Sequence, residues 1–189
     1  MLAPTQLLSA SRQNLWRLTW IRLLVLSAQA GTLGFTYLSD WVALDWMPLL
    51  GILLFSLSMC VLTSLRLRGS WPVTELEFAA HLAMDLLIHS GLLYYVGGST
   101  NPFVAYYLVP LTIAAATLPW LYSIVLSGFS LTGYTALLIW YRPLHLQGEQ
   151  VDELLINLHL FGMWLNFALS AAFITFFVSK MSEAVREQD

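Results

Sequence analysis

The chain has 189 residues, of which 58% are hydrophobic and 10% charged, whereas soluble domains carry about one quarter charged residues. This composition indicates an integral membrane protein. The net charge is −3, and the eight lysines and arginines form no basic stripe, so we expect no nucleic-acid partner. A single cysteine, Cys60, excludes an intramolecular disulfide.

Six apolar segments follow one another along the chain, and a helix needs about 20 such residues to cross a bilayer. The fourth segment is short and contains Pro110, which favours a kink or a helix that does not cross straight. We expect an all-α integral membrane protein, a bundle of six transmembrane helices. The expected helices cover residues 18–38, 47–65, 77–96, 103–118, 121–141 and 155–179.

Cationic residues predict the orientation, because loops rich in lysine and arginine stay in the cytoplasm. With six crossings, only Arg142 falls on the outer side. Both the N and the C terminus are therefore expected in the cytoplasm, in a multi-pass protein. The cations on the inner side are Arg12, Arg17, Arg22, Arg66, Arg68, Lys180 and Arg186.

The domain organisation is correspondingly simple. Residues 1–179 are expected to form one six-helix transmembrane domain, with no separate soluble domain. The charged residues 180–189 are expected to start a cytoplasmic linker. Phe177, Met181 and Ala184 have the spacing of a coiled-coil seam at that point.

One heptapeptide interrupts the apolar chain, at the expected outer end of the third and fourth helices: Gly97-Gly98-Ser99-Thr100-Asn101-Pro102-Phe103. The glycines permit positive φ, and the proline drives Asn101 toward an extended conformation, so the backbone must turn. Irregular backbone at membrane depth survives only where protein or a water-filled cavity satisfies its polar groups. Two interpretations remain open, a plain helix–helix turn and a site for a small polar headgroup.

A polar stripe runs along the third helix, since Glu77, His81, Asp85 and His89 recur every fourth residue and such neighbours share a face. A charge at the bilayer centre costs about 2.5–3.5 kcal/mol on insertion scales, so Asp85 should face the bundle interior. His81, Asp85 and His89 could form a hydrogen-bonded network that serves proton-coupled chemistry or recognises a carbonyl headgroup. A structural network between helices is the alternative.

No catalytic constellation is present. The chain has no nucleophile elbow, no glycine loop with a phosphate-binding lysine and no HExxH. We therefore predict no catalytic residues and no metal site. Histidines on different helices, such as His81 and His159, could in principle bind haem.

Gly97, Gly98, Asn101, Pro102 and Phe103 match every specified position of a GGxxNPF signature. With these residues placed after the third helix, the chain resembles the transmembrane sensor domain of the RegB/PrrB/ActS (RoxS-like) redox-sensing histidine kinases. The resemblance implies that these five residues bind ubiquinone, in a bacterial inner membrane. It also implies a homodimer that reports respiratory redox state to a response regulator through a cytoplasmic kinase core.

The chain departs from that family's pattern, because it contains no phosphoacceptor box and no ATP lid. It is expected to be the sensor part of a phosphotransferase, without catalytic machinery of its own. In the binding hypothesis the quinone ring lies near Phe103, and Asn101 or amides near Gly97 and Gly98 donate to its carbonyls. The alternatives are a quinone- or haem-binding membrane subunit of a respiratory oxidoreductase, and a small transporter, for which no broken-helix repeat is evident.

Overall fold

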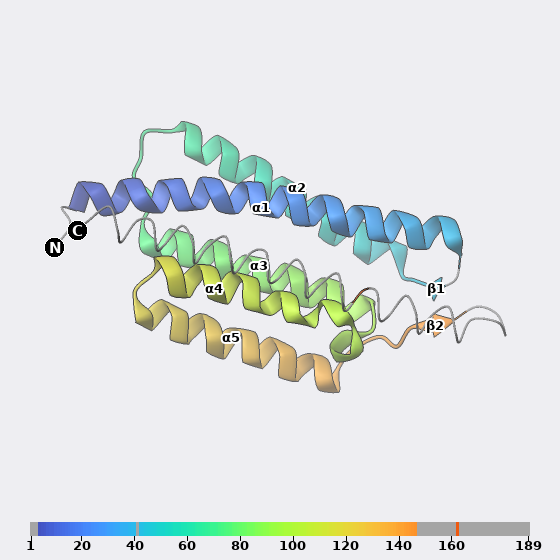
Figure 1. Cartoon of the computed structure of the whole chain (residues 1–189). Helices are drawn as coiled ribbons and strands as arrows, with labels where there is room; N and C mark the ends of the chain where they lie inside the picture. Colours follow the sequence, from blue (N-terminus) through green and yellow to red (C-terminus); the bar gives the residue numbers. More distant parts are fainter. Residues whose placement is uncertain (1–3, 41, 147–161, 163–189) are drawn as a thin grey trace. The chain divides into compact units, whose positions relative to one another are not determined.

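The computed structural model describes residues 4–40, 42–146 and 162, and this part of the chain is helical apart from one short strand pair (Figure 1). The predicted all-α class is confirmed for these residues. The elements in chain order are α1 (Pro4–Ser39), β1 (Val42–Ala43), α2 (Trp46–Arg68), α3 (Glu75–Tyr95), the 3-10 helices η1 (Gly98–Thr100) and η2 (Pro102–Tyr107), α4 (Leu108–Thr117), α5 (Trp120–Ile139) and β2 (His145–Leu146).

Four helices are long and apolar enough to cross a membrane, namely Ser11–Ser39, Trp46–Arg68, Glu75–Tyr95 and Trp120–Ile139. They correspond to the first, second, third and fifth predicted spans. The sixth predicted span apart from Gly162, the seam at 177–184 and the linker at 180–189 lie outside the described residues. The count of six helices and the cytoplasmic termini therefore stay predictions.

The fourth predicted span differs from a simple helix. Residues Pro102–Tyr107 form a 3-10 helix, and α-helix begins only at Leu108. Pro110 consequently lies in the first turn of α4, where its missing amide breaks no helical bond and no kink is needed. The ten residues of α4 extend about 15 Å, half of a hydrocarbon core of about 30 Å.

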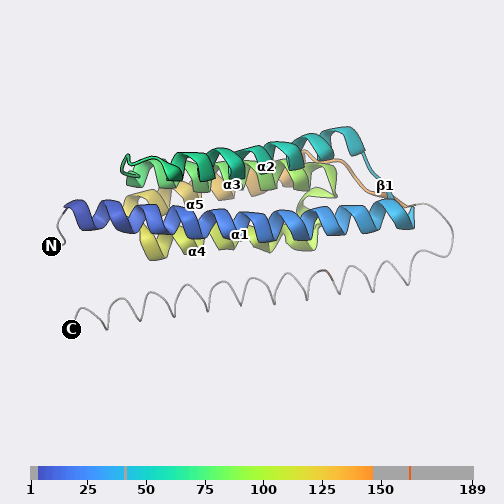
Figure 2. The same ribbon diagram turned by 90° about the horizontal axis from the view of Figure 1, so that it is seen from above.

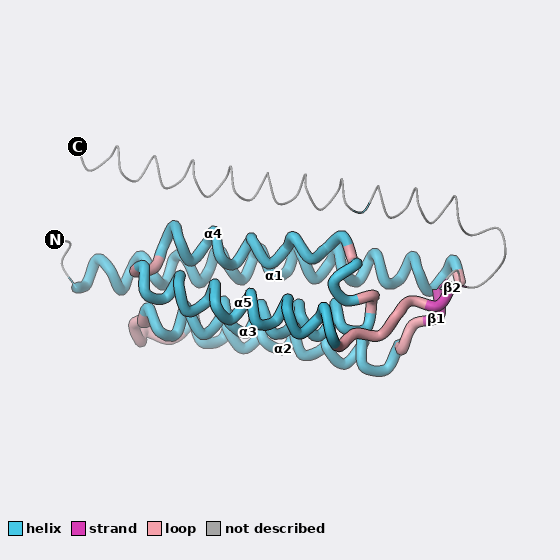
Figure 3. Tube along the Cα trace, turned by 90° about the horizontal axis from the view of Figure 1, so that it is seen from below, coloured by secondary structure: helices cyan, strands magenta, loops and turns pink. Residues whose placement is uncertain are grey.

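The structure divides into two compact units, the first of which comprises residues 1–81 and 144–148. Within it α1 packs along α2 (Figure 2). The strands β1 and β2 pair in antiparallel fashion, with Val42 opposite Leu146 and Ala43 opposite His145 (Figure 3). This pair ties the turn between α1 and α2 to a segment about 100 residues later in the chain.

Arg12 fastens α1 to the C-terminal end of α2. Its guanidinium donates through Nη1 to the Gly69 carbonyl at 2.9 Å and through Nη2 to the Leu67 carbonyl. The last carbonyls of a helix have no intrahelical donors and carry the negative end of the helix dipole, so a guanidinium there is favourable.

Replacing Arg12 with glutamine is expected to lower the free energy of unfolding by about 1–2 kcal/mol, because glutamine cannot reach both carbonyls. The measurement is unfolding of the purified domain in detergent. Arg17→Gln removes the same charge from an exposed position on α1 and should leave stability unchanged. Equal stability of both variants would show that the Arg12 contacts contribute nothing.

The second unit comprises residues 82–143 and 149–189, and its described part contains most of α3, the heptapeptide turn, α4 and α5. Many large apolar side chains of α5 are exposed, among them Ile124, Val125 and Leu131 at 56%, 62% and 66%. Such a surface is unfavourable in water and suits a hydrocarbon environment.

Candidate functional site

The heptapeptide forms a tight turn between α3 and η2. Gly97 and Gly98 both have positive φ, 101° and 60°, which only glycine adopts without steric cost. The Thr100 amide and hydroxyl both donate to the Gly97 carbonyl, at 3.3 and 2.8 Å. The Asn101 amide donates to the Gly98 carbonyl at 3.2 Å, so the turn supplies many of its own hydrogen bonds.

Gly98 also permits a close approach to the end of α5. A Cβ built at this position would lie 2.4 Å from Cβ of Tyr141 and 3.1 Å from the Leu137 carbonyl. In the chain that follows α5, the Arg142 amide donates to the carbonyl of Tyr94 at 2.8 Å, which satisfies a carbonyl in the last turn of α3. The turn is therefore seated against the chain that follows α5.

Asn101 holds the shape of this turn. Its Oδ1 accepts from the Phe103 amide at 2.9 Å, which caps η2, and its Nδ2 donates to the Val96 carbonyl at 2.7 Å. The asparagine thus uses its acceptor and one of its two N–H groups within the turn. The sequence predicted that Asn101 could donate to a quinone carbonyl. Only one side-chain N–H of Asn101 remains for such a bond.

His89 of α3 contacts the last residue of the heptapeptide, Phe103. Its Nε2 donates to the carbonyl of Phe103 at 3.0 Å, and its ring packs against Tyr106 and Tyr107, with centroids 4.7 and 5.4 Å away. A carbonyl only accepts, so Nε2 carries the proton and Nδ1 of the neutral imidazole is an acceptor. Nδ1 is buried, and within the described part of the chain no donor reaches it.

A second polar contact joins α3 to η2. The Ser90 hydroxyl donates to the Leu86 carbonyl at 2.7 Å, so the Tyr107 hydroxyl, 2.5 Å away, must donate to Ser90 Oγ. Gly133 of α5 makes room for this pair, because a Cβ there would lie 3.1 Å from Ser90 Oγ. Tyr107 is 5% exposed, so its hydroxyl needs this partner.

In the polar stripe of α3, Asp85 and His89 are buried and Glu77 and His81 are half-buried. Glu77, His81 and His89 each have partners of their own. Glu77 belongs to a helix cap, where its amide donates to Thr74 Oγ1 at 3.1 Å, and its carboxylate pairs with Arg66 at 3.0 Å. His81 receives Arg22, whose Nη2 donates to the His81 carbonyl at 2.7 Å. Buried Asp85 lies between the two histidines, and a continuous network through it stays a prediction.

Sequence reasoning missed several residues around the turn. Tyr107 and Ser90 come from two elements, and Tyr141 closes on Gly98 from a third segment. Gly162 also approaches the heptapeptide, since a Cβ there would lie 3.1 Å from Cγ of Pro102. Aromatic residues just after Phe103 were the one local signal for this cluster.

Among the residues that the structure describes, no group of three or more histidine, cysteine, aspartate or glutamate side chains could hold a metal ion. Cys60 is buried. The candidate site is the heptapeptide with His89, Tyr106 and Tyr107, which brings aromatic rings and hydrogen-bonding groups together.

The fold and this turn define a helical membrane protein whose polar loop is built onto a buried histidine. The chain is 26% identical over 192 aligned positions to the sensor histidine kinase RegB of Cereibacter sphaeroides. The alignment covers 98% of this chain and lies in the N-terminal part of RegB, which confirms the resemblance to a RegB-like sensor domain.

The chain spans 41% of the length of this relative. No protein-family model matches the chain, and no solved structure matches it.

Proposed function

We propose that this chain is the quinone-binding sensor domain of a histidine kinase in a bacterial inner membrane, which it crosses several times. The single observation that carries the proposal is the placement of the GGxxNPF turn on His89. The Phe103 carbonyl of the signature holds Nε2, and the buried Nδ1 has no donor among the described residues. The similarity to RegB supports the sensor class.

The acceptor at Nδ1 distinguishes the two redox forms of a quinone. A quinol presents hydroxyl donors, which complement the lone pair of Nδ1. A quinone presents carbonyl acceptors, which Nδ1 of the neutral imidazole cannot satisfy. The quinone therefore has to rely on the remaining Asn101 N–H or on backbone amides. Such a difference in binding is what a ligand needs to shift a conformational equilibrium.

Binding at Nδ1 is coupled to a change in the turn. The atom has no exposed surface, so a headgroup reaches it only when a covering side chain, such as the ring of Tyr106, moves. The ligand thereby selects a second arrangement of η2. Pro102 lies beside Gly162, so this rearrangement would reach the segment that leads toward the C-terminal end. We expect the signal to pass along it to a kinase core, in a homodimer that acts on a response regulator.

Equilibrium binding of ubiquinone to the purified domain tests the proposal. Phe103→Ala should weaken binding about tenfold, because an aromatic stacking partner contributes about 0.5–1.5 kcal/mol beyond its buried area. Phe129→Ala removes a partly exposed phenylalanine from α5 of the same unit and should leave the affinity unchanged. Unchanged affinity in Phe103→Ala would refute the site.

An absorption spectrum of the same preparation tests the alternative of a respiratory subunit. The sensor proposal expects a colourless protein that co-purifies with quinone. A Soret band with stoichiometric haem would contradict the sensor proposal and favour the oxidoreductase subunit.

A further inference from the structure

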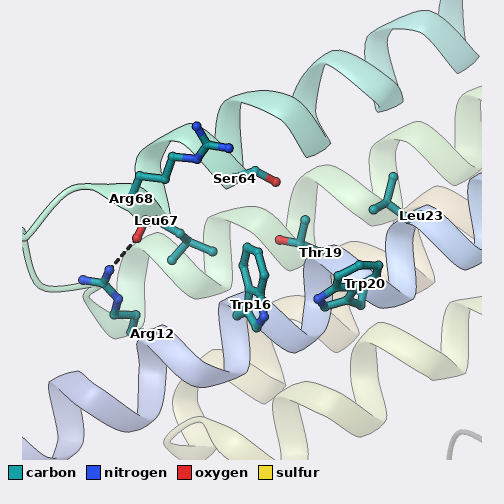
Figure 4. A pocket seen from close by; sticks show the side chains of 8 residues that line it. All are labelled: Arg12, Trp16, Thr19, Trp20, Leu23, Ser64, Leu67 and Arg68. Atoms are coloured by element: carbon teal, nitrogen blue, oxygen red, sulfur yellow. Dashed lines mark hydrogen bonds between the residues drawn. The ribbon is translucent and has the colours of Figure 1, made fainter.

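A pocket of about 490 Å³ opens between α1 and α2, within the first unit (Figure 4). This volume lies in the range of about 300–1,000 Å³ that small-molecule sites occupy. Apart from two leucines, the side chains that line it are Arg12, Trp16, Thr19, Trp20, Ser64 and Arg68.

The pocket is positively charged. Arg12 and Arg68 line it from the two helices, and the described lining residues include no carboxylate. Arg12 already donates to the carbonyls that end α2, which holds its charge in place. Arg68 is exposed, and within the described residues no hydrogen bond or ion pair of its side chain is found. Its neighbour Arg66, in contrast, is paired with Glu77.

The pocket lies at one boundary of the membrane spans. Arg12 is the second residue of the apolar span Ser11–Ser39, and Arg68 is the last residue of the span Trp46–Arg68. Trp16 and Trp20 are 47% and 60% exposed and meet edge to face with ring centroids 6.0 Å apart. Exposed tryptophans at the end of a span are typical of the headgroup level.

We propose that this pocket binds the phosphate headgroup of an anionic phospholipid. Arginine binds phosphate oxygens through charge-assisted hydrogen bonds, and basic pockets between transmembrane helices bind anionic headgroups. The two tryptophans and Leu23 continue the pocket toward the apolar part of the span, where acyl chains lie. Free phosphate could bind the same arginines, but it has no apolar part that would contact the tryptophans and Leu23. The positive-inside rule assigns the lipid to the cytoplasmic leaflet.

The test measures lipid retention by the detergent-solubilised, quinone-free domain, using native mass spectrometry. Phosphatidylglycerol is compared with phosphatidylcholine of the same acyl chains, so that only the headgroup charge differs. We expect preferential retention of phosphatidylglycerol. Arg68→Gln should lower its apparent affinity about fivefold, as expected for one basic residue near an anionic headgroup. Arg68 is preferred over Arg12 because its side chain fastens no helix.

Arg17→Gln is the matched control, since it removes the same charge from an exposed position of α1 that does not line the pocket. It should retain phosphatidylglycerol as the unsubstituted domain does. If both variants lost phosphatidylglycerol equally, the retention would depend on general surface charge, and the proposed site would be wrong. Equal retention of the two lipids, or displacement by inorganic phosphate at equal concentration, would overturn the lipid as its occupant.

Discussion

Substituting Gly98 with alanine is expected to lower the free energy of unfolding by about 2–4 kcal/mol, the sum of left-handed backbone strain and overpacking. The residue has φ of 60°, and an added Cβ would lie 2.4 Å from Cβ of Tyr141. A rotamer change cannot relieve the strain at φ, which lies in the backbone. It cannot relieve the overpacking either, because the nearest atoms include Cβ of Tyr141 and the Leu137 carbonyl oxygen. Unfolding of the purified domain in detergent measures the effect.

Gly128→Ala provides the control for Gly98→Ala. Gly128 lies in α5 of the same unit, and a Cβ there would meet nothing within 4 Å. Alanine should therefore be neutral or stabilise the helix by up to about 1 kcal/mol. If Gly98→Ala were as stable as Gly128→Ala, the turn could not be seated against Tyr141 as described. Ubiquinone binding by any folded Gly98→Ala protein should also fall, because the turn must move.

Replacing His89 with glutamine is expected to remove the discrimination between ubiquinol and ubiquinone. The terminal amide nitrogen of glutamine matches Nε2, so the bond to the Phe103 carbonyl is retained, whereas the acceptor at Nδ1 is lost. Loss of one hydrogen bond of about 0.5–1.5 kcal/mol should weaken ubiquinol binding about twofold to tenfold and spare ubiquinone. The dissociation constants of both forms are measured anaerobically.

His89→Asn is the complementary variant. Its side-chain amide occupies the position of Nδ1 and cannot reach the Phe103 carbonyl, so it should loosen the turn and retain a polar partner for the headgroup. The two variants together separate anchoring of the loop from ligand recognition. An unchanged ratio of the two affinities in His89→Gln would show that Nδ1 does not recognise the quinol, even if ubiquinone still bound at Phe103.

The local parts of the fold were predictable. Apolar runs of about 20 residues marked four spans correctly, because crossing a bilayer requires such a length whatever the neighbours are. The glycines and Pro102 marked the turn for a similarly local reason, the limits they set on φ. The fourth predicted span was less accurate, since its first five residues belong to a 3-10 helix, a choice that local composition does not decide.

Side-chain roles were predicted less well than positions. His89 was recognised as a buried polar residue, but its bond to the carbonyl of Phe103 joins residues 14 apart through a turn. Asn101, or amides near Gly97 and Gly98, were expected to donate to a ligand, and this stays a prediction. Asn101 also caps η2 and binds the Val96 carbonyl, a role that was not predicted. A carboxamide can satisfy a loop or a ligand equally well, and only the path of the backbone decides between them.

The sequence by itself determined that this is a helical membrane protein with a GGxxNPF turn after its third span, because hydropathy and backbone restriction are properties of short segments. Only the tertiary structure decided which groups meet. It placed Tyr141 against Gly98, left Nδ1 of His89 buried without a donor among the described residues, and brought Arg12 and Arg68 to one pocket. These contacts join distant parts of the chain, and the packing of whole helices decides them.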